Sequence, residues 1–464
     1  MEALLDSAIK YAKELGADYA EARLQKSKGT SLSLSNGILE GGSFGQSVGL
    51  SVRILVNKTL GFGHTDQLDP ESIKSVVKFA FAAAKANKKA ANVRFSPANP
   101  VVKEYEVKEK KNLQDISVKE KLDFLKSLDA KISGARQRLF DYIDGIDERL
   151  FLNTEGTKIK SRIPRCSLFY IFTVSESGQT AQRMWDYGGV GGFEVAEKWN
   201  LAEILPEEFK ELSKVLSEGA KVPSGKYDLV VGPQISGIIA HESCGHPFEA
   251  DRIIGREAAQ AGESWIEPSM LGKSLAKDFV NIIDDPTIEG SAGFFLYDDE
   301  GIPARPKYLI KEGKINCFLH NRESSAALNQ ENNGSARAAN YSVEPLVRMS
   351  NTFFKPGQLS EKELIEGVKK GIYFKNFMEW NIDDRRYNNK YTSAIAYLIE
   401  NGKLTKPVKP VSLEITTPVL YAAIDAIGSN FELHAATCGK GEPMQGIPVT
   451  HGGGSLRLRE VKIK

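Results

Sequence analysis

One short segment combines the residue types that zinc chemistry needs. It reads His241-Glu242-Ser243-Cys244-Gly245-His246-Pro247, so it holds two of the six histidines, five positions apart, with an acid directly after the first. Zinc hydrolases use neutral imidazoles to hold Zn²⁺ and a carboxylate to take a proton from the metal-bound water. The segment therefore predicts a hydrolytic zinc site with Glu242 as the general base.

The spacing of the two histidines is unusual for a zinc site on a helix. The common HExxH motif places its histidines about 40° apart around a regular α-helix, whereas a five-residue spacing leaves about 140°. A π-type turn of about 4.4 residues would reduce this offset to about 50°. Gly245 tolerates unusual backbone angles, and Pro247 disfavours α geometry at His246. We therefore predict a helix over about 233–244 that opens or ends at Gly245 and lets His246 swing back toward His241.

The competing interpretation of this segment is a buried helix whose histidines form hydrogen bonds inside the core. In that case a buried Glu242 would lack an obvious partner, and an unpaired buried carboxylate costs free energy. We therefore favour the metal site.

The third zinc ligand is open on chemistry alone. Cys244 lies three residues after His241 and could share its helical face. A thiolate on zinc is well precedented, and the glycines after Cys438 suit a loop folded tightly against a site. The remaining candidates are Glu249, Asp251, His434 and His451.

The composition is that of an ordinary globular protein. At 464 residues two or three domains are expected, and a net charge of +1 leaves no polybasic field for nucleic acid or a membrane surface. No apolar run approaches the ~18 residues of a membrane span. The acidic start, Met1–Asp6, is unlike a signal peptide, and the four scattered cysteines indicate thiols or metal ligands rather than a disulfide framework. We expect a cytoplasmic protein.

Apolar periodicity predicts four helices in the first half of the chain, at 4–15, 73–84, 118–132 and 201–219. Short strands are predicted between them, at 19–24, 30–35, 48–56, 140–143, 148–152, 157–161 and 167–174. Asn36-Gly37 is a hairpin signal, and Pro223-Ser224-Gly225-Lys226 is a plausible domain boundary. We therefore expect one domain over 1–222 and a second over 223–464.

The second domain is expected to begin with a short apolar strand at 227–231, which leads into the helix that carries the histidines. Residues 279–283 are predicted to form a strand and 361–370 a helix. Two further apolar segments, 394–399 and 418–427, fit either a helix or a buried strand.

Several blocks along nearly the whole chain form a characteristic set. Beside His241–His246, they are Gly16–Glu21, Gly49–Arg53, Asp298–Pro303, Pro345–Thr352, Glu400–Lys403 and Cys438–Lys440. Together they resemble the TldD/PmbA family of metallopeptidases. The HExxxH pattern resembles its TldD branch, because the other branch lacks this motif. Trp380-Asn381-Ile382-Asp383 departs from the family, in which a glycine pair is expected.

The resemblance implies a Zn²⁺ site built by His241, His246 and Cys438, with Glu242 as general base. It implies an α+β fold, in which a mixed amino-terminal domain precedes a β-rich carboxy-terminal domain that holds the metal. It also implies hydrolysis of small or unfolded peptides and a heterodimer with a motif-lacking TldE/PmbA-like relative, or else a homodimer. The family is also associated with DNA gyrase modulation, but the charge of this chain does not support direct DNA binding.

The other polar residues have less specific interpretations. With Cys438 as ligand, Cys244 is expected to be a small buried side chain and His434 a packed strand histidine. His451 could contact substrate or lie in a flexible loop. Arg348 could bind a peptide carboxylate or hold an internal ion pair. Four residues are expected to be structural. They are Asp298 and Asp299, as a capped turn rather than a cation site, and His64 and His320.

Two classes of function are compatible with these patterns. The leading interpretation is a zinc-dependent peptidase with three protein ligands and a water in the fourth position. The alternative is a peptide- or partner-binding protein with a structural zinc, which would need a fourth protein ligand such as Cys244 or Glu249. A third possibility is a zinc hydrolase that acts on other amides.

Overall fold

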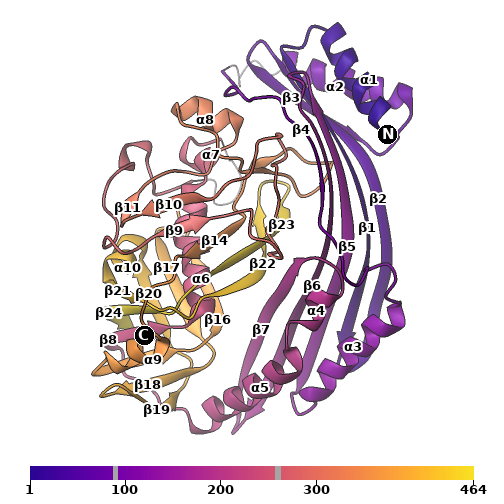
Figure 1. Ribbon diagram of the computed structural model, residues 1–464. Helices are drawn as coiled ribbons and strands as arrows, with labels where there is room; N and C mark the ends of the chain where they lie inside the picture. The colour runs from indigo at the N-terminus through magenta and orange to yellow at the C-terminus, as the bar shows by residue number, and fades with distance from the viewer. Residues whose placement is uncertain (87–91, 257–262) are drawn as a thin grey trace.

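A long curved sheet forms the amino-terminal half of the protein, and the carboxy-terminal half lies against its inner side (Figure 1). The structure is a computed structural model that describes residues 1–86, 92–256 and 263–464. The sheet has the order β3-β2-β1-β5-β6-β4, with β7 paired to β6. Its strands are β1 (Tyr19–Ser35), β2 (Ile38–Val56), β3 (Thr59–Thr65), β4 (Val102–Glu106), β5 (Gln137–Asn153), β6 (Lys158–Glu176) and β7 (Gln179–Val190).

The strands of this sheet are longer than the pattern of apolar residues predicts. Segments 19–24 and 30–35 belong to the single strand β1, and the four segments predicted between 140 and 174 merge into β5 and β6. Glycines interrupt the pattern where two backbones approach closely. Gly29 pairs with Gly145, and a Cβ at Gly29 would lie 2.1 Å from the carbonyl oxygen of the residue before Gly145. The hairpin at Asn36-Gly37 is confirmed, and both residues have positive φ.

Helices cover both ends of the sheet. α1 (Glu2–Glu14) and α2 (Pro70–Ala86) pack against apolar side chains of β1 and β2 at one end. α3 (Val118–Lys131) and α5 (Leu201–Glu218) pack at the other end, beside the short α4 (Glu194–Glu197). The four helices predicted in this half are therefore confirmed.

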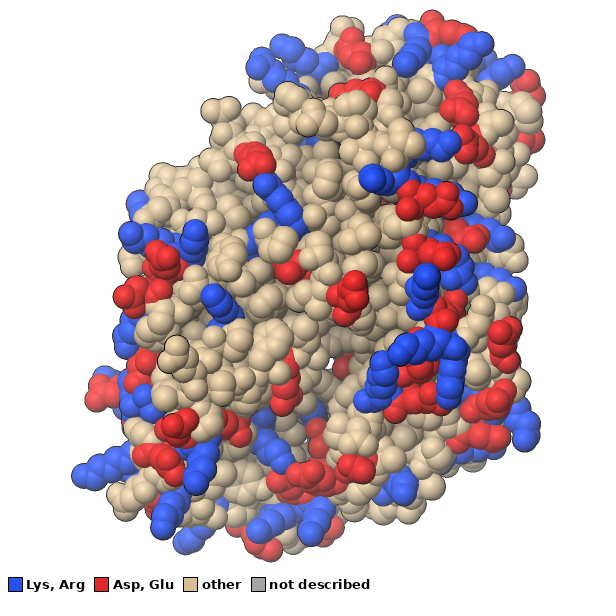
Figure 2. All heavy atoms as spheres, in the orientation of Figure 1, with Lys and Arg blue, Asp and Glu red and all other residues tan. Residues whose placement is uncertain are grey.

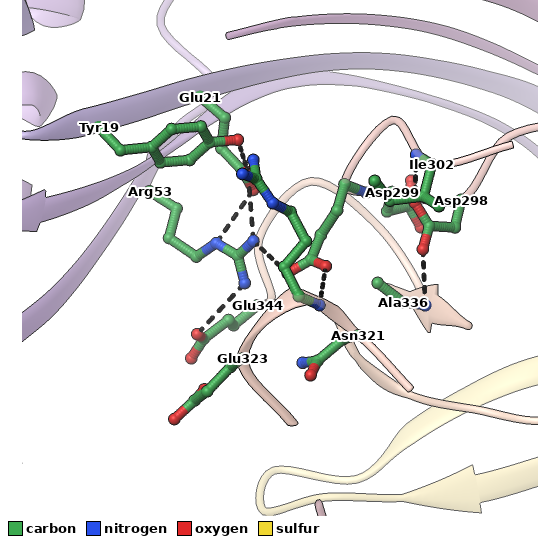
Figure 3. A network of polar contacts seen from close by, with 12 residues as sticks. Tyr19, Glu21, Arg53, Asp298, Asp299, Ile302, Asn321, Glu323, Ala336 and Glu344 are labelled. Carbon is green, nitrogen blue, oxygen red and sulfur yellow. Dashed lines mark hydrogen bonds and ion pairs between the residues drawn. The ribbon is translucent and has the colours of Figure 1, made fainter. Parts of the chain in front are cut away.

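Buried ion pairs join the sheet to the carboxy-terminal half. The Nε of Arg53, on β2, lies 3.0 Å from Glu21 Oε1 on β1. The Nη2 of the same side chain lies 2.6 Å from Glu300 Oε1 (Figure 3). Nearby, Arg322 Nη1 lies 2.7 Å from Glu155 Oε2. Because Arg53, Glu21 and Glu300 are all buried, each of these charges depends on the others for compensation.

Removing Arg53 is expected to destabilise the protein by roughly 3–5 kcal/mol, because Glu21 and Glu300 would remain buried without their cation. The variant is Arg53→Met, and the measurement is the free energy of unfolding in urea. Lys74→Met is the control, since Lys74 and Glu71 form an exposed ion pair 3.4 Å long whose loss costs at most about 1 kcal/mol. Similar losses in the two variants would contradict a special role for Arg53.

The carboxy-terminal half, within the described residues, contains two larger sheets and one small one. The first has the order β11-β10-β9-β14-β23-β22, and the second has the order β16-β17-β20-β24-β8-β15-β18-β19, with β21 paired to β24. The strands are β8 (Gly225–Val231), β9 (Ile282–Asp284), β10 (Lys307–Lys311), β11 (Lys314–Ile315), β12 (Ala336–Arg337), β13 (Leu346–Val347), β14 (Asn351–Phe354), β15 (Lys370–Phe374), β16 (Phe377–Ile382), β17 (Asn388–Ser393), β18 (Ala396–Glu400), β19 (Lys403–Val408), β20 (Ser412–Thr416), β21 (Ile424–Ile427), β22 (Glu432–Lys440), β23 (Gln445–Gly453) and β24 (Leu456–Ile463).

The helices of this half are short. They are α6 (Pro233–Ala240), α7 (Ala250–Ile253), α8 (Arg322–Leu328), α9 (Glu361–Glu366) and α10 (Thr417–Ala423). The two ambiguous segments resolve differently, because 394–399 lies mainly in strand β18 whereas 418–427 begins in α10 and ends in β21. The helix predicted over 361–370 ends at Glu366, since the chain then enters β15. Helices and many strands together make the fold α+β.

The surface seen in Figure 2 carries basic and acidic side chains interspersed with one another. This face therefore presents no extended field of one sign. Within the part of the chain that the structure describes, no helix is both long and apolar enough to cross a membrane.

Candidate metal centre

The histidine segment forms the π-type turn that would bring both rings toward one metal, although the helix predicted to reach about residue 244 ends at Ala240. Helix α6 runs from Pro233 to Ala240, and His241–Gly245 then forms a π-helix that is followed by a 3₁₀ turn over His246–Phe248. The wider turn brings the ring centroids of the two histidines to 4.8 Å from each other. The prediction that His246 swings back toward His241 is therefore confirmed.

The expectation that Gly245 and Pro247 cause this turn through unusual backbone angles is wrong. Gly245 has helical φ and ψ of −52° and −60°, but a Cβ there would lie 1.8 Å from the Met349 sulfur. His246 also keeps helical angles of −61° and −47°, although it precedes Pro247. A larger residue at this position would therefore displace the buried Met349 side chain, a contact that the local sequence does not reveal.

Three side chains from distant parts of the chain converge at the π-turn. One ligand atom from each of His241, His246 and Cys438 lies within 4.8 Å of the others, and all three residues are buried. Cys438 comes from β22, and its Sγ lies 3.4 Å from His246 Nε2. His241 Nδ1 is buried and has no hydrogen-bond partner among the described residues. An unpaired imidazole nitrogen, a second imidazole and a thiol form a donor set that fits Zn²⁺.

The surroundings prepare two of these groups for metal binding. Burial lowers the pKa of His241, which favours the neutral imidazole that coordinates metals. Burial alone would raise the pKa of the Cys438 thiol, but the positive charges of His246 and Arg348 outweigh it and lower that pKa to about 7. The lowered pKa favours the thiolate form of Cys438, which is the form that binds metals.

Glu242 has a partner that the sequence did not suggest. Arg386, in the turn between β16 and β17, donates from Nη1 to Glu242 Oε2 at 3.1 Å. Burial by itself would raise the pKa of Glu242, but the charges of His246 and Arg386 outweigh it, so the net shift is downward. An ionised carboxylate can accept a proton. The only sequence signal for Arg386 was the nearby departure from the family pattern at Trp380–Asp383.

Glu249 and Asp251, which were considered as ligands, support the site instead. Glu249 Oε2 lies 3.1 Å from His246 Nδ1, and Lys440 Nζ lies 3.2 Å from the same oxygen. Lys440 also lies 2.7 Å from Asp251 Oδ1 and comes two residues after Cys438. The two carboxylates therefore orient the His246 ring and hold the strand that carries Cys438. The spacing of three residues between His246 and Glu249 was the signal available in the sequence.

Glu249→Gln is expected to weaken zinc affinity by roughly 10–100-fold, because the His246 ring loses the carboxylate that orients it. The measurement is a zinc titration against a competing chelator. Glu197→Gln is the matched control, since Glu197 pairs with Lys111 on the surface. Wild-type affinity in the Glu249 variant would show that other contacts orient the ring.

The remaining cysteine and histidine candidates lie outside the ligand cluster. Cys244 is buried beside Tyr421, and His434 packs against Trp185 with ring centroids 5.3 Å apart, as expected for structural residues. His451 lies in strand β23 opposite His434, and not in a loop. Its ring centroid is 6.1 Å from that of His241, so the two rings pack against each other.

The family blocks that lacked obvious chemistry have structural contacts. Arg348 donates from Nη1 to the Gln445 carbonyl at 2.9 Å and from Nη2 to the Cys438 carbonyl, so it holds the β22–β23 hairpin rather than an acid. Asp298 caps a turn, because it accepts hydrogen bonds from three backbone amides. Asp299 pairs with Arg149 at 2.9 Å. Outside the family blocks, His64 is exposed on β3, and His320 is buried with its Nδ1 3.2 Å from Ser324 Oγ.

Three models of one protein family match the chain. They describe PmbA/TldA metallopeptidase domain 1 at 20–84, the central domain at 111–220 and the C-terminal domain at 224–464. The chain belongs to the TldD/PmbA family of metallopeptidases. The resemblance seen in the sequence blocks is thus confirmed.

Members with similar sequences span nearly the same length. A metalloprotease of Methanothermobacter thermautotrophicus is 32% identical and covers 96% of this chain and 95% of its own. A zinc metalloprotease TldD homolog of Saccharolobus solfataricus is 25% identical and covers 98% of both chains. Among solved structures, TldE from Thermococcus kodakarensis has a TM-score of 0.75 at 17% identity over 99% of both chains. A proposed DNA gyrase modulator from Thermotoga maritima has a TM-score of 0.82 at 19% identity over 100% of both. At such identities these two structures show the shared fold alone.

Proposed function

We propose that this TldD/PmbA family member is a zinc-dependent metallopeptidase that hydrolyses small or unfolded peptides. The observation that carries the proposal is the convergence of His241, His246 and Cys438 within 4.8 Å of one another, with Glu242 next to His241 in the π-turn. The relative named as a zinc metalloprotease supports the choice of metal. The three residues would hold a zinc ion, which as a Lewis acid lowers the pKa of a bound water and polarises a carbonyl group.

Glu242 performs the proton transfers in this proposal. Its ionised carboxylate takes a proton from the attacking water and later gives it to the amine of the leaving fragment. Arg386 binds Oε2, whereas Oε1 makes no hydrogen bond to any described residue, which leaves that oxygen for the proton. Arg386 thereby fixes which oxygen of Glu242 acts.

A cleft of about 710 Å³ lies between the amino-terminal sheet and the β22–β23 hairpin, and Thr437 lines it. Neighbouring residues of a strand point to opposite faces, so Cys438 faces away from this cleft. The choice of small or unfolded peptides as substrates therefore rests on the family resemblance.

The test combines metal analysis of the pure protein with digestion of a peptide library, before and after chelator treatment. We expect stoichiometric zinc and hydrolysis that chelation abolishes and added zinc restores. Bound zinc without hydrolysis of any peptide would favour the binding protein with a structural zinc. Hydrolysis that persists after complete removal of zinc would contradict the proposal.

We also propose that the protein works as a dimer, with a motif-lacking TldE/PmbA-like relative or with a second copy of itself. The fold that it shares with TldE supports this assembly. Light scattering should report a dimer for the pure chain or for its mixture with such a relative. A fully active monomer that captures no relative in pull-downs would contradict it. The cytoplasmic location stays a prediction.

A further inference from the structure

A small polar cavity lies where the amino-terminal sheet meets the carboxy-terminal half. Its volume is about 80 Å³, and Asp147, Arg165 and Pro448 line both this cavity and the larger cleft of about 710 Å³. A cavity of this size has room for several water molecules or for one small ion. The shared lining residues show where such an ion enters, because the larger cleft opens to solvent.

Three arginines from three different strands line this cavity. They are Arg149 on β5, Arg165 on β6 and Arg337 on β12, and the side chains of Tyr105 and Ser161 line it as well. Arginine is rarely buried unless an opposite charge accompanies it. Three guanidinium groups around so small a space therefore raise the question of what neutralises them.

The carboxylates of the cavity do not neutralise all three arginines. Arg149 Nη1 lies 2.9 Å from Asp299 Oδ1, and Arg165 Nη1 lies 3.7 Å from Asp147 Oδ2. Burial, together with a neighbouring glutamate, raises the pKa of Asp298 well above its usual range, which favours the neutral acid. Three guanidinium groups therefore share two carboxylates that form ion pairs.

Arg337 is the arginine of this cavity that is left without a carboxylate, since it forms no ion pair within the described parts of the chain. It is 7% exposed, and its Nη1 and Nη2 donate to the backbone carbonyls of Met349, at 2.7 Å, and Pro448, at 2.8 Å. Burial, followed by the charges of Arg165 and Arg348, lowers the pKa of Arg337 to about 9. A cation in this position has lost its hydration without gaining an opposite charge, so a bound anion would recover free energy.

A second buried arginine shows why the cavity matters. Arg348 also donates to backbone carbonyls, but its charge favours ionisation of the nearby Cys438 thiol. The protein itself thus supplies an anionic group for Arg348. Arg337 instead has the cavity beside it, and Asp299, the carboxylate that attracts it, is already paired with Arg149.

We propose that this cavity binds one small tetrahedral oxyanion, of the size of phosphate or sulfate, between the two halves of the protein. Guanidinium groups bind such anions through charge-assisted hydrogen bonds, often in pairs. Arg337 supplies them from the carboxy-terminal half and Arg165 from the amino-terminal sheet, and the hydroxyl groups of Tyr105 and Ser161 can donate to further oxygens. None of the three proposed zinc ligands lines the cavity, so the anion site is separate from the metal centre and does not depend on the proposed function.

The experiment is calorimetric titration of the zinc-loaded, full-length protein with inorganic phosphate in a Tris-chloride buffer, with a parallel titration of sulfate. We expect one oxyanion bound per chain, and the ratio of the two affinities identifies the oxyanion that the cavity prefers. Thermal unfolding is the second readout, because a ligand that binds only the folded protein raises Tm. Sodium chloride at the same ionic strength should raise Tm less than the bound oxyanion does.

Variants locate the anion. Arg337→Gln should raise the Kd for phosphate by about 10–100-fold, the factor that a hydrogen bond to a charged group contributes. Arg165→Gln should weaken binding as well, and it decides the question if Arg337→Gln does not fold. Arg305→Gln is the matched control, since Arg305 forms an exposed ion pair with Glu331 at 2.8 Å. Protein treated with a chelator should bind phosphate as tightly as zinc-loaded protein.

Four results would overturn the inference. If neither oxyanion binds to the wild-type protein, the cavity holds only water. Unchanged affinity in Arg337→Gln, or in Arg165→Gln where the first variant does not fold, would place the anion elsewhere. Loss of binding after chelation would place it on the zinc ion. An equal rise of Tm with chloride would show a general effect of salt. None of these results bears on peptide hydrolysis, so the proposed function is tested separately.

Discussion

Glu242→Gln should lower peptide hydrolysis by at least about 10²–10⁴-fold while zinc content stays near that of wild type. Glutamine keeps the size of the side chain and an oxygen that can accept from Arg386, but it lacks a basic carboxylate. The proton of the attacking water would then have no acceptor of suitable pKa. Zinc content and kcat should be measured on one preparation.

The pattern of results separates three roles of Glu242. If it only supported a ligand, zinc affinity would weaken by about 10–100-fold and excess zinc would restore activity. In a binding protein, peptide affinity would survive and wild type would show no turnover. Glu379→Gln, at an exposed ion pair with Lys390 on the β16–β17 hairpin, is the control that should remain active. Near-normal hydrolysis by fully metallated Glu242→Gln would contradict the mechanism.

Cys438→Ala should lose most of the bound zinc. Its zinc affinity should fall by more than the roughly 10–100-fold that loss of a supporting contact costs. Cys438 is expected to supply a charged ligand atom, and alanine leaves nothing in its place. Cys244→Ala is the matched control, because Cys244 is buried but lies outside the ligand cluster. Zinc is measured by metal analysis, and thermal unfolding establishes that both variants fold.

Two results would overturn the ligand assignment. Full zinc content in Cys438→Ala would show that two histidines and another group suffice. Zinc lost from Cys244→Ala but kept in Cys438→Ala would reverse the roles of the two cysteines.

The π-turn was predictable because it follows from local geometry. The rotation per residue of an α-helix is set by the backbone, so two histidines five positions apart require a wider turn if both bind one metal. The helices of the amino-terminal half were equally local, since each shows apolar residues at helical spacing. The full length of strands β1 and β5 was not predictable, because glycines such as Gly29 and Gly145 interrupt their apolar alternation.

The choice of Cys438 required more than local chemistry. It lies 192 residues from His246, and the residues alone left six candidates open. The family resemblance selected it, and the fold brings its Sγ to 3.4 Å from His246 Nε2.

By itself, the sequence determined the histidine motif and the wider turn that its spacing needs, because these depend on residue types and short spacings. The family and the α+β class followed from the resemblance of blocks along nearly the whole chain. Only the tertiary structure decided the partners of the site. Arg386 reaches Glu242 across 144 residues, and Lys440 meets Glu249 from another strand. Such pairs depend on which hairpins and helices the fold places side by side. The periodicity of a single segment does not predict that arrangement. The contact between Arg386 and Glu242 is therefore known only from the folded position of the β16–β17 hairpin against the π-turn.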